Sequence, residues 1–336
     1  MRPINETASR GIGLIELMVA LALSAILVLG VTQVYVSAKA TYNTQEGLSR
    51  LQENGRIALM LLQRDIRNSD YWGCMSNLGG VTNHLDDSSA GYDPSLHSYD
   101  QSIDGAEGGA GSDSLILRSG AGTPINVTMQ PSTPAAALQV SAGHGLAQGD
   151  VIFVSDCQSG DVYQISNSNP GSSNQAAHNT GVGSPGNKSI TSTPGCPASA
   201  SNCLSKLYDT NARIFRAKTV AYSVQTSGVT GEPALVRSSN GGAAELADGV
   251  ESFQILYGED TDNDGVANRY VPANLVADWD AVVAIRVGLL MRTDDQIAEQ
   301  EDTGTYDVLG TSVGPFNDRR LRKVFTATVG VRNRLK

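Results

Sequence analysis

The stretch RGIGLIELMVA, residues 10–20, introduces the most apolar part of this chain. No charged residue occurs from Leu17 to Ala38, so Glu16 stands at the very start of a long run of apolar side chains. A carboxylate at the centre of a lipid bilayer costs roughly 2.5–3.5 kcal/mol on insertion scales. A chain that keeps an acid at this place is expected to supply a partner for it, and most of the functional interpretation follows from Glu16.

The segment in front of the apolar run, residues 1–11, is short, polar and slightly basic. A secretory signal peptide has its cleavage site after the apolar core, typically with an Ala-x-Ala pattern. The nearest candidate, residues 37–40, fits that pattern poorly, whereas a break is evident before the core at Gly11–Ile12. We therefore predict that residues 1–11 are a leader that is removed and that the apolar segment stays on the mature protein.

Residues 12–38 are long enough to cross a membrane. As an α-helix they would extend about 40 Å, and the hydrocarbon layer is about 30 Å thick. Further on, apolar residues recur at three- and four-residue spacing, namely Leu48, Leu51, Ala58, Leu62 and Ile66. This spacing predicts an amphipathic helix. We expect one helix over residues 12–70, whose second part packs on the rest of the protein by its apolar face.

The remainder, residues 71–336, is predicted to be a β-rich globular domain in the periplasm or outside the cell. Strand-like runs occur at 114–118, 125–129, 138–141, 151–156, 214–225, 234–237, 250–257, 282–292 and 323–332. Two Gly/Ser-rich stretches, 73–112 and 158–203, are predicted to be loops, the second extended or mobile at the surface. One long helix followed by runs of strands indicates an α+β fold with an antiparallel sheet.

Composition argues against several classes of function. The net charge is −10 and no Lys/Arg-rich tract occurs, so we expect no nucleic-acid surface. A G-x-G-x-x-G match at residues 181–186 neither follows an apolar strand nor opens a helix, which excludes a dinucleotide site. The four histidines lie in polar or Gly-rich surroundings and are interpreted as surface residues. No constellation of nucleophile and base is apparent, so we predict a protein without enzymatic activity.

The cysteines are even in number and none forms a C-x-x-C pair, which disfavours a zinc ribbon. In an exported protein they fit two disulfides. A bridge between Cys74 and Cys157 would tie the end of the helix to the sheet, and Cys196–Cys203 would close a local loop. Four cysteines allow three connectivities, and the other two remain open.

An acidic loop follows one of the predicted strands. Asp260, Asp262 and Asp264 alternate along the chain before Gly265, as at the start of a D-x-D-x-D-G calcium loop, and Asn268 is a further candidate ligand. The twelfth position of the loop is Val271, so the usual bidentate carboxylate is missing. Asp278 or Asp280 would replace it only if the fold brings them back. The alternative is a solvated hairpin turn.

The N-terminal pattern resembles the type IV prepilin motif. The resemblance rests on Gly11, the apolar Ile12 after it, Glu16 five residues in, the short charged leader and the uninterrupted apolar helix. It implies that a prepilin peptidase cuts after Gly11 and N-methylates Ile12. It also implies that Glu16 pairs with the N-terminal amine of a neighbouring subunit. A buried acid without such a partner would cost on the order of 3–5 kcal/mol.

Looser features resemble minor pilins of the PilW type: the segments 65–67, 71–74 and 257–260, Trp279, and a closing strand that ends at 331–333. The resemblance implies a subunit that acts with other minor pilins and the major pilin to prime pilus assembly at or near the tip. The inner-membrane assembly platform is a further implied partner. Before assembly the protein would sit in the bacterial inner membrane through residues 12–38, and afterwards on the pilus at the cell surface.

Glu16 argues against the extreme tip, because the corresponding tip subunit of related secretion systems tends to lack this acid. Two alternatives carry the same N-terminal signature. One is a pseudopilin of a type II secretion system. The other is a pilus-borne adhesin whose long loops bind a surface ligand.

Overall fold

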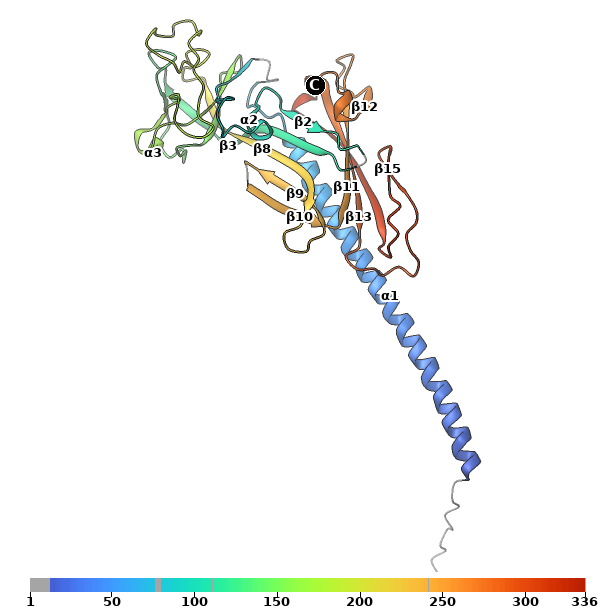
Figure 1. The fold of residues 1–336 in the computed structure, drawn as a ribbon. Coiled ribbons are helices and arrows are strands. Elements are labelled where there is room, and N and C mark those ends of the chain that lie inside the picture. The colour runs from blue at the N-terminus through green and yellow to red at the C-terminus, as the bar shows by residue number, and fades with distance from the viewer. Residues whose placement is uncertain (1–12, 76–79, 110, 241, 336) are drawn as a thin grey trace, which may run out of the picture.

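The computed structural model describes residues 13–75, 80–109, 111–240 and 242–335. Helix α1, Leu14–Asn68, is by far its longest element and extends about 80 Å at 1.5 Å per residue. Its first part projects from the globular domain, and its second part lies against that domain (Figure 1). The predicted helix over 12–70 is observed from Leu14 to Asn68, two residues short of its expected C-terminal end, and the α+β fold class is confirmed.

The sequence accounts for the unbroken length of α1, and Ser69 marks its end. No proline interrupts it, and its buried residues Leu51, Ala58, Leu62 and Ile66 have the predicted three- and four-residue spacing. Ser69 leaves the helical conformation, and its N–H donates to the carbonyl of Ile66.

Short helices and many strands make up the rest of the described chain. The strands of the first half are β1 Val81–Asn83, β2 Ile103–Ala106, β3 Ser114–Met129, β4 Leu138–Val140, β5 Val151–Ser155, β6 Gly160–Gln164 and β7 Gln175–Ala176. Those of the second half are β8 Arg213–Thr226, β9 Pro233–Ser239, β10 Gly242–Asp248, β11 Val250–Glu259, β12 Arg269–Val271, β13 Val282–Arg292, β14 Tyr306–Val308, β15 Thr311–Val313 and β16 Arg322–Gly330. The helices beside α1 are α2 Pro94–His97, α3 Pro170–Ser173, η1 Ala273–Leu275, η2 Trp279–Ala281 and η3 Arg332–Arg334.

The named strands form two main sheets and one hairpin. The larger sheet has the order β1-β6-β5-β8-β3-β4-β7, with β2 on β3 and the β9–β10 hairpin on β8. The smaller sheet has the order β12-β11-β13-β16. All pairs are antiparallel except β1 with β6. The predicted antiparallel sheet is therefore correct in kind, but it is divided into two.

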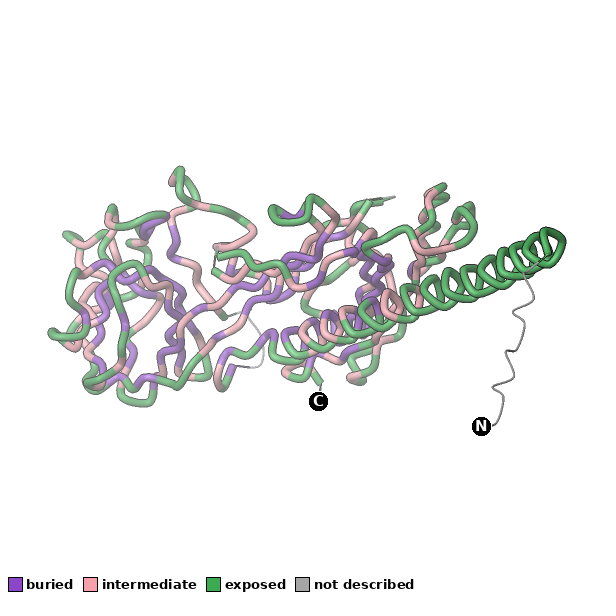
Figure 2. The backbone as a smooth tube through the Cα atoms, turned by 90° about the horizontal axis from the view of Figure 1, so that it is seen from below, coloured by how far each residue is buried: buried purple, intermediate pink, exposed green. Residues whose placement is uncertain are grey.

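The described chain has three apolar clusters, of which the smallest surrounds Trp72 and Phe153 and the two larger ones belong to separate regions of the molecule. The first core joins α1 to both sheets, with Leu62, Tyr222, Phe253 and Val287 among its fully buried members. The second core lies between Ile125 and Ile214 in the sequence. We call residues 125–214 the distal lobe, because it occupies the end of the molecule away from the exposed part of α1 (Figures 1 and 2).

Two loop predictions are wrong. Residues 73–112 contain β1, α2 and β2, and residues 158–203 contain β6, α3 and β7. The second stretch is packed by polar contacts. The buried amide of Asn187 accepts from the N–H of Gln164 at 2.7 Å and donates to its carbonyl at 2.7 Å, so one side chain takes the place of a neighbouring strand. Composition missed this because such contacts need few apolar residues.

Candidate docking helix and acidic loop

The globular domain does not bury any residue in the first part of α1. Every residue from 13 to 43 is exposed, including large apolar side chains such as Leu14 at 78% and Val34 at 70%. Among the described helices it is the one long and apolar enough to span a membrane. A continuous apolar surface of this extent is unstable in water, so this segment requires lipid or other apolar helices around it.

Glu16 lies in the first turn of α1, on this exposed segment. An acid in the first turn of a helix is favoured by the positive end of the helix dipole. The dipole alone is a weak compensation in an apolar environment, so a cation on a neighbouring molecule would add most of the stabilisation. Gly11 and Ile12, the predicted cleavage and methylation residues, lie outside the described residues.

The second part of α1 is fixed to the domain by close packing. Gly55 faces the ring of Phe325 on β16 so closely that a Cβ atom there would lie 2.7 Å from the ring. About three turns further along α1, Asp65 accepts hydrogen bonds from Arg237 Nε on β9 at 2.6 Å and from the Tyr222 hydroxyl on β8 at 2.8 Å. The helix is therefore held by both sheets.

The residues that follow α1 form a buried cluster of hydrogen-bonded polar side chains. Trp72 Nε1 donates to Ser102 Oγ at 2.8 Å and to Asp70 at 3.1 Å, and Ser102 also donates to Asp70. Arg334, near the C-terminus, donates through Nε to Asp70 at 2.6 Å. The end of the helix is thus connected to residues near both ends of the domain sequence, which fixes the direction in which the exposed segment projects.

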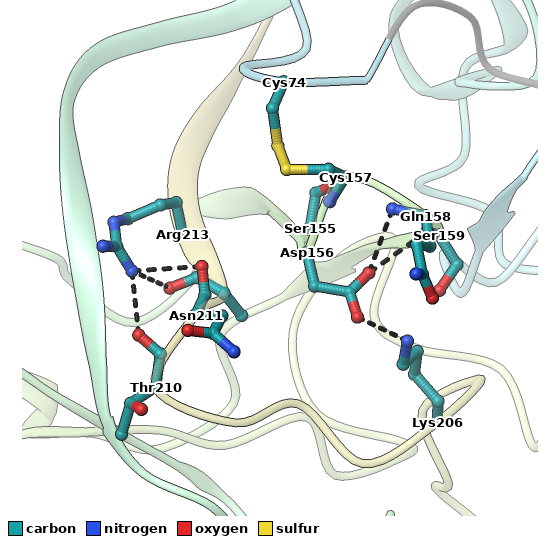
Figure 3. The surroundings of a disulfide bond; sticks show 11 residues. Cys74, Ser155, Asp156, Cys157, Gln158, Ser159, Lys206, Thr210, Asn211 and Arg213 are labelled. Carbon is teal, nitrogen blue, oxygen red and sulfur yellow. Dashed lines mark hydrogen bonds and ion pairs between the residues drawn. A yellow bond between two sulfur atoms is a disulfide. The ribbon is translucent and has the colours of Figure 1, made fainter.

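A disulfide adds a covalent connection at the same place. Cys74 pairs with Cys157, which follows β5, and Cys196 pairs with Cys203. Beside the first bridge, the carboxylate of Asp156 accepts from the N–H groups of Gln158 and Ser159 and forms an ion pair with Lys206 (Figure 3). The bridge therefore joins the end of α1 to an ordered turn at the base of the distal lobe.

The acidic loop connects β11 and β12. One carboxylate oxygen from each of Asp260, Asp262 and Asp264 lies within 4.8 Å of the others, with Asp260 buried and the other two exposed. Asp260 accepts from the N–H groups of Asp264 at 3.1 Å and Gly265 at 2.8 Å. Burial raises the pKa of Asp260, but backbone N–H donors outweigh that effect and its pKa lies below the usual value. The three carboxylates can hold a metal ion.

The other predicted metal ligands lie differently. Asn268 Oδ1 accepts from the N–H of Thr261 at 2.7 Å and from its hydroxyl at 3.2 Å, so it closes the loop. Asp278 and Asp280 line the same pocket as Asp260, with Arg334 beside them. The fold thus brings Asp278 and Asp280 back toward the loop, which the sequence left undecided.

A second polar cluster, in the distal lobe, was not predicted from the sequence. Asp161 is fully buried and accepts hydrogen bonds from the hydroxyls of Ser205 at 2.8 Å and Tyr208 at 2.5 Å. It also contacts His84 Nε2 at 2.6 Å. His84 and His178 are each 3% exposed, so the prediction that all histidines are on the surface is wrong. They are buried because carboxylate and carbonyl partners replace water around their rings.

Two segments of the chain match models of known protein families. Residues 221–333 match the family model described as Type IV Pilus-assembly protein W, and residues 7–32 match the model described as Prokaryotic N-terminal methylation motif. A type IV-like pilin from Thermus thermophilus is similar at 12% sequence identity and a TM-score of 0.34, over 85% of this chain and 98% of that chain. Nothing matches among curated protein sequences. The first match extends from β8 to η3, and the second includes the start of α1.

Proposed function

We propose that this chain is a minor pilin that helps to initiate assembly of a type IV pilus at or near its tip. Its residues 221–333 belong to the pilus-assembly protein W family, and its residues 7–32 carry the N-terminal methylation motif. The predicted resemblance is confirmed by these two matches. The protein is a structural subunit, in agreement with the prediction that it is not an enzyme.

The exposed part of α1 carries this proposal. Its apolar residues are exposed around the whole circumference of the helix, so they suit a lipid environment first and a bundle of like helices afterwards. Cleavage at Gly11 would leave the amine of Ile12 close to Glu16 of an adjoining subunit. Because an acid and an amine satisfy one another only in one register, their pairing would make entry into the filament selective.

The place of the distal lobe supports a position at or near the tip. The lobe lies at the end of the molecule away from the exposed helix (Figure 1). Successive subunits of a filament stack along its axis, so a bulky region at that end is accommodated most easily where few subunits lie beyond it. Glu16 indicates that at least one neighbour is present, which favours a place just below the extreme tip.

Partners and localisation follow from the same features. The methylation motif implies a prepilin peptidase and other pilins as partners. We propose that these include other minor pilins, the major pilin and the inner-membrane assembly platform. Before assembly, residues 12–38 would anchor the protein in the inner membrane with its domain in the periplasm, and after assembly the domain would lie on the pilus surface.

Deletion and complementation test this function. A deletion strain should lose most of its surface pili and should regain them with the wild-type chain, whereas Gly11→Ala should remain unprocessed and fail to complement. Intact mass of the protein from sheared pili would report cleavage, methylation and disulfides together. Normal pili that fail only in adhesion would favour an adhesin, and normal pili with impaired protein secretion would favour a pseudopilin.

We further propose that the acidic loop binds Ca²⁺, on the strength of the three converging carboxylates. Calcium prefers oxygen ligands, and three carboxylates with backbone carbonyls and water are enough for a weak site. Titration calorimetry of the full-length protein in detergent should show Ca²⁺ binding that Asp262→Asn and Asp264→Asn together abolish. Asp307→Asn, at an exposed position on β14, is the control. Equal binding by the double variant would refute the site.

A further inference from the structure

Strand β16 forms one edge of the smaller sheet. It pairs with β13 over nine consecutive residues, from Arg322 to Gly330, without a register shift. No other named strand of the described chain pairs with it. A long regular strand with one free edge is uncommon in a soluble protein, because its unpaired backbone groups are a template for another strand.

The hydrogen-bond pattern identifies the groups that point outward. The N–H of Val331 donates to the carbonyl of Val283, and the N–H of Thr293 donates to the carbonyl of Leu321. In an antiparallel ladder such bonds recur at every second residue. The odd-numbered residues of β16 therefore face β13, and the N–H and C=O groups of Val324, Thr326 and Thr328 point away from it.

The edge lacks the usual protection. Natural edge strands carry prolines, charged side chains or bulges that prevent pairing. Here Arg322 and Lys323 are at the beginning of the strand, and Arg322 is held inside by ion pairs with three carboxylates, those of Glu251, Asp302 and Asp318. From Val324 to Gly330 no proline, charge or bulge occurs, and Thr326 and Thr328 are exposed.

A groove lies between this edge and helix α1. Lys323 and Phe325 form one side of it, and α1 forms the other with Arg56, Leu59 and Met60. Met60 is an apolar side chain that is 58% exposed. A strand added to β16 would place alternate side chains over Phe325 and Met60, so its sequence should be apolar at every second position.

We propose that this edge and groove receive an extended strand from a different pilin-type subunit, an inference that rests on the proposed function. The unpaired backbone groups require a partner with its own unpaired donors and acceptors, and an extended strand satisfies this requirement. Two copies of β16 that pair antiparallel with each other would be related by a two-fold axis perpendicular to the sheet. Their α1 helices would then project in opposite directions, although both must enter the same membrane from the same side.

Site-directed photo-crosslinking of the full-length protein in piliated cells tests the inference. Benzoylphenylalanine at Thr328 should form an adduct with another protein that carries the methylation motif, and the crosslinked peptide should belong to an extended segment. The same probe at Val229, which is 89% exposed on the turn between β8 and β9, is the positional control and should not give this adduct.

A pair of substitutions separates the backbone from the side chain. Thr326→Pro removes an outward N–H that makes no ladder bond to β13, so the domain should fold with both disulfides. Thr326→Val retains that N–H and is the matched control. The adduct should fall about tenfold or more with Thr326→Pro, since loss of a backbone hydrogen bond and a steric block act together. With Thr326→Val it should stay at the wild-type level.

Several results would overturn the inference. An adduct with a second copy of this chain would refute the proposed occupant. The absence of an adduct in cells where the protein is present in pili would refute the docking site, and this outcome does not depend on the folding of Thr326→Pro. A folded Thr326→Pro protein that crosslinks like wild type would refute strand addition. If the protein never occurs with other pilins, the proposed function itself fails, and the inference fails with it.

Discussion

The carboxylate of Asp65 on α1 lies 2.6 Å from Arg237 Nε on β9 and also accepts from the hydroxyl of Tyr222 on β8. Asp65 and Arg237 are 172 residues apart in the sequence, and their side chains are 6% and 18% exposed. Burial raises the pKa of Asp65, but the hydrogen bonds from Arg237 and Tyr222 outweigh this and lower it. This pair therefore connects the docking helix to the larger sheet by a charge that is present at neutral pH.

Asp65→Asn should destabilise the full-length protein by about 2 kcal/mol, because a buried hydrogen bond to a charged group contributes roughly 1.5–3 kcal/mol. Urea unfolding in detergent, followed by circular dichroism, measures this. Glu46→Gln on the same helix is the control, since Glu46 pairs with Arg50 at 2.6 Å on the exposed surface. Equal stability of Asp65→Asn and wild type would show that the pair does not hold the helix.

The same pair makes a prediction about pH. Because the pKa of Asp65 is lower in the folded state than its ordinary value of 3.8, its contribution is complete above that value and is lost as the pH falls through the folded pKa. The difference in unfolding free energy between wild type and Asp65→Asn should thus stay constant from pH 7 to about 5 and shrink below about pH 4. A difference that grows on acidification would contradict the depressed pKa.

The two disulfides should differ in their contribution to stability. They close segments of 83 and 7 residues. In the chain-entropy treatment such loops correspond to about 4.5 and about 2.4 kcal/mol. Replacing Cys74 and Cys157 with serine should therefore lower the unfolding free energy by about 2 kcal/mol more than replacing Cys196 and Cys203. Equal effects in chemical unfolding would indicate that the end of α1 is held by its polar contacts instead.

Helix α1 and the acidic loop were largely predictable from the sequence. The helix followed from apolar spacing and the absence of proline, since these are local properties of the chain. The acidic loop followed from alternate carboxylates, and Asp260 and Asp264 indeed lie together. These features depend on residues close in the sequence, so periodicity and spacing detect them.

The strands predicted at 138–141 and 151–156 are present in the distal lobe as β4 and β5, but the fold of residues 158–203 was not predictable in this way. Its order depends on single polar contacts between distant residues, such as Asn187 with the backbone of Gln164 and His84 with Asp161. Such contacts leave no periodic signal, and Gly/Ser-rich composition is typical of loops. The free edge of β16 was also hidden, because strand order within a sheet is decided by long-range pairing.

The buried histidine of the distal lobe should make the protein sensitive to mild acid. Burial, together with nearby His84, lowers the pKa of His178 to about 4, although the hydrogen bond to the Pro134 carbonyl and the charge of Asp161 act in the opposite direction. In the unfolded chain the value is near 6.5, so unfolding takes up a proton below that pH. From pH 7 to pH 5 this linkage should reduce the unfolding free energy by about 2 kcal/mol.

His178→Gln and His178→Phe remove the titrating group in two different ways. Both variants should lose less unfolding free energy than wild type between pH 7 and pH 5, although their stability at pH 7 is expected to be lower. Urea unfolding at a series of pH values measures the slope. If only one of the variants flattened the slope, altered packing and not protonation would be responsible.

Glu16 gives the sharpest prediction about assembly. In the filament its carboxylate is expected to be enclosed by apolar helices, where an amine on a neighbouring subunit would compensate its charge. Glu16→Gln keeps the shape of the side chain but removes the charge, and it leaves the amine without a partner. Breaking a buried pair in this way costs about 3–5 kcal/mol, which corresponds to a hundredfold or greater loss of incorporation.

The ratio of variant to wild-type protein in sheared pili, relative to the ratio in membranes, measures that loss by quantitative mass spectrometry. Processing at Gly11 should be unchanged, because the substitution lies beyond the cleaved bond, and this separates a docking defect from a cleavage defect. Glu46→Gln, on the same helix within the domain, should be incorporated normally. If Glu16→Gln enters pili as efficiently as Glu46→Gln, the acid does not select the neighbour, and the apolar surface of α1 alone would have to specify the register.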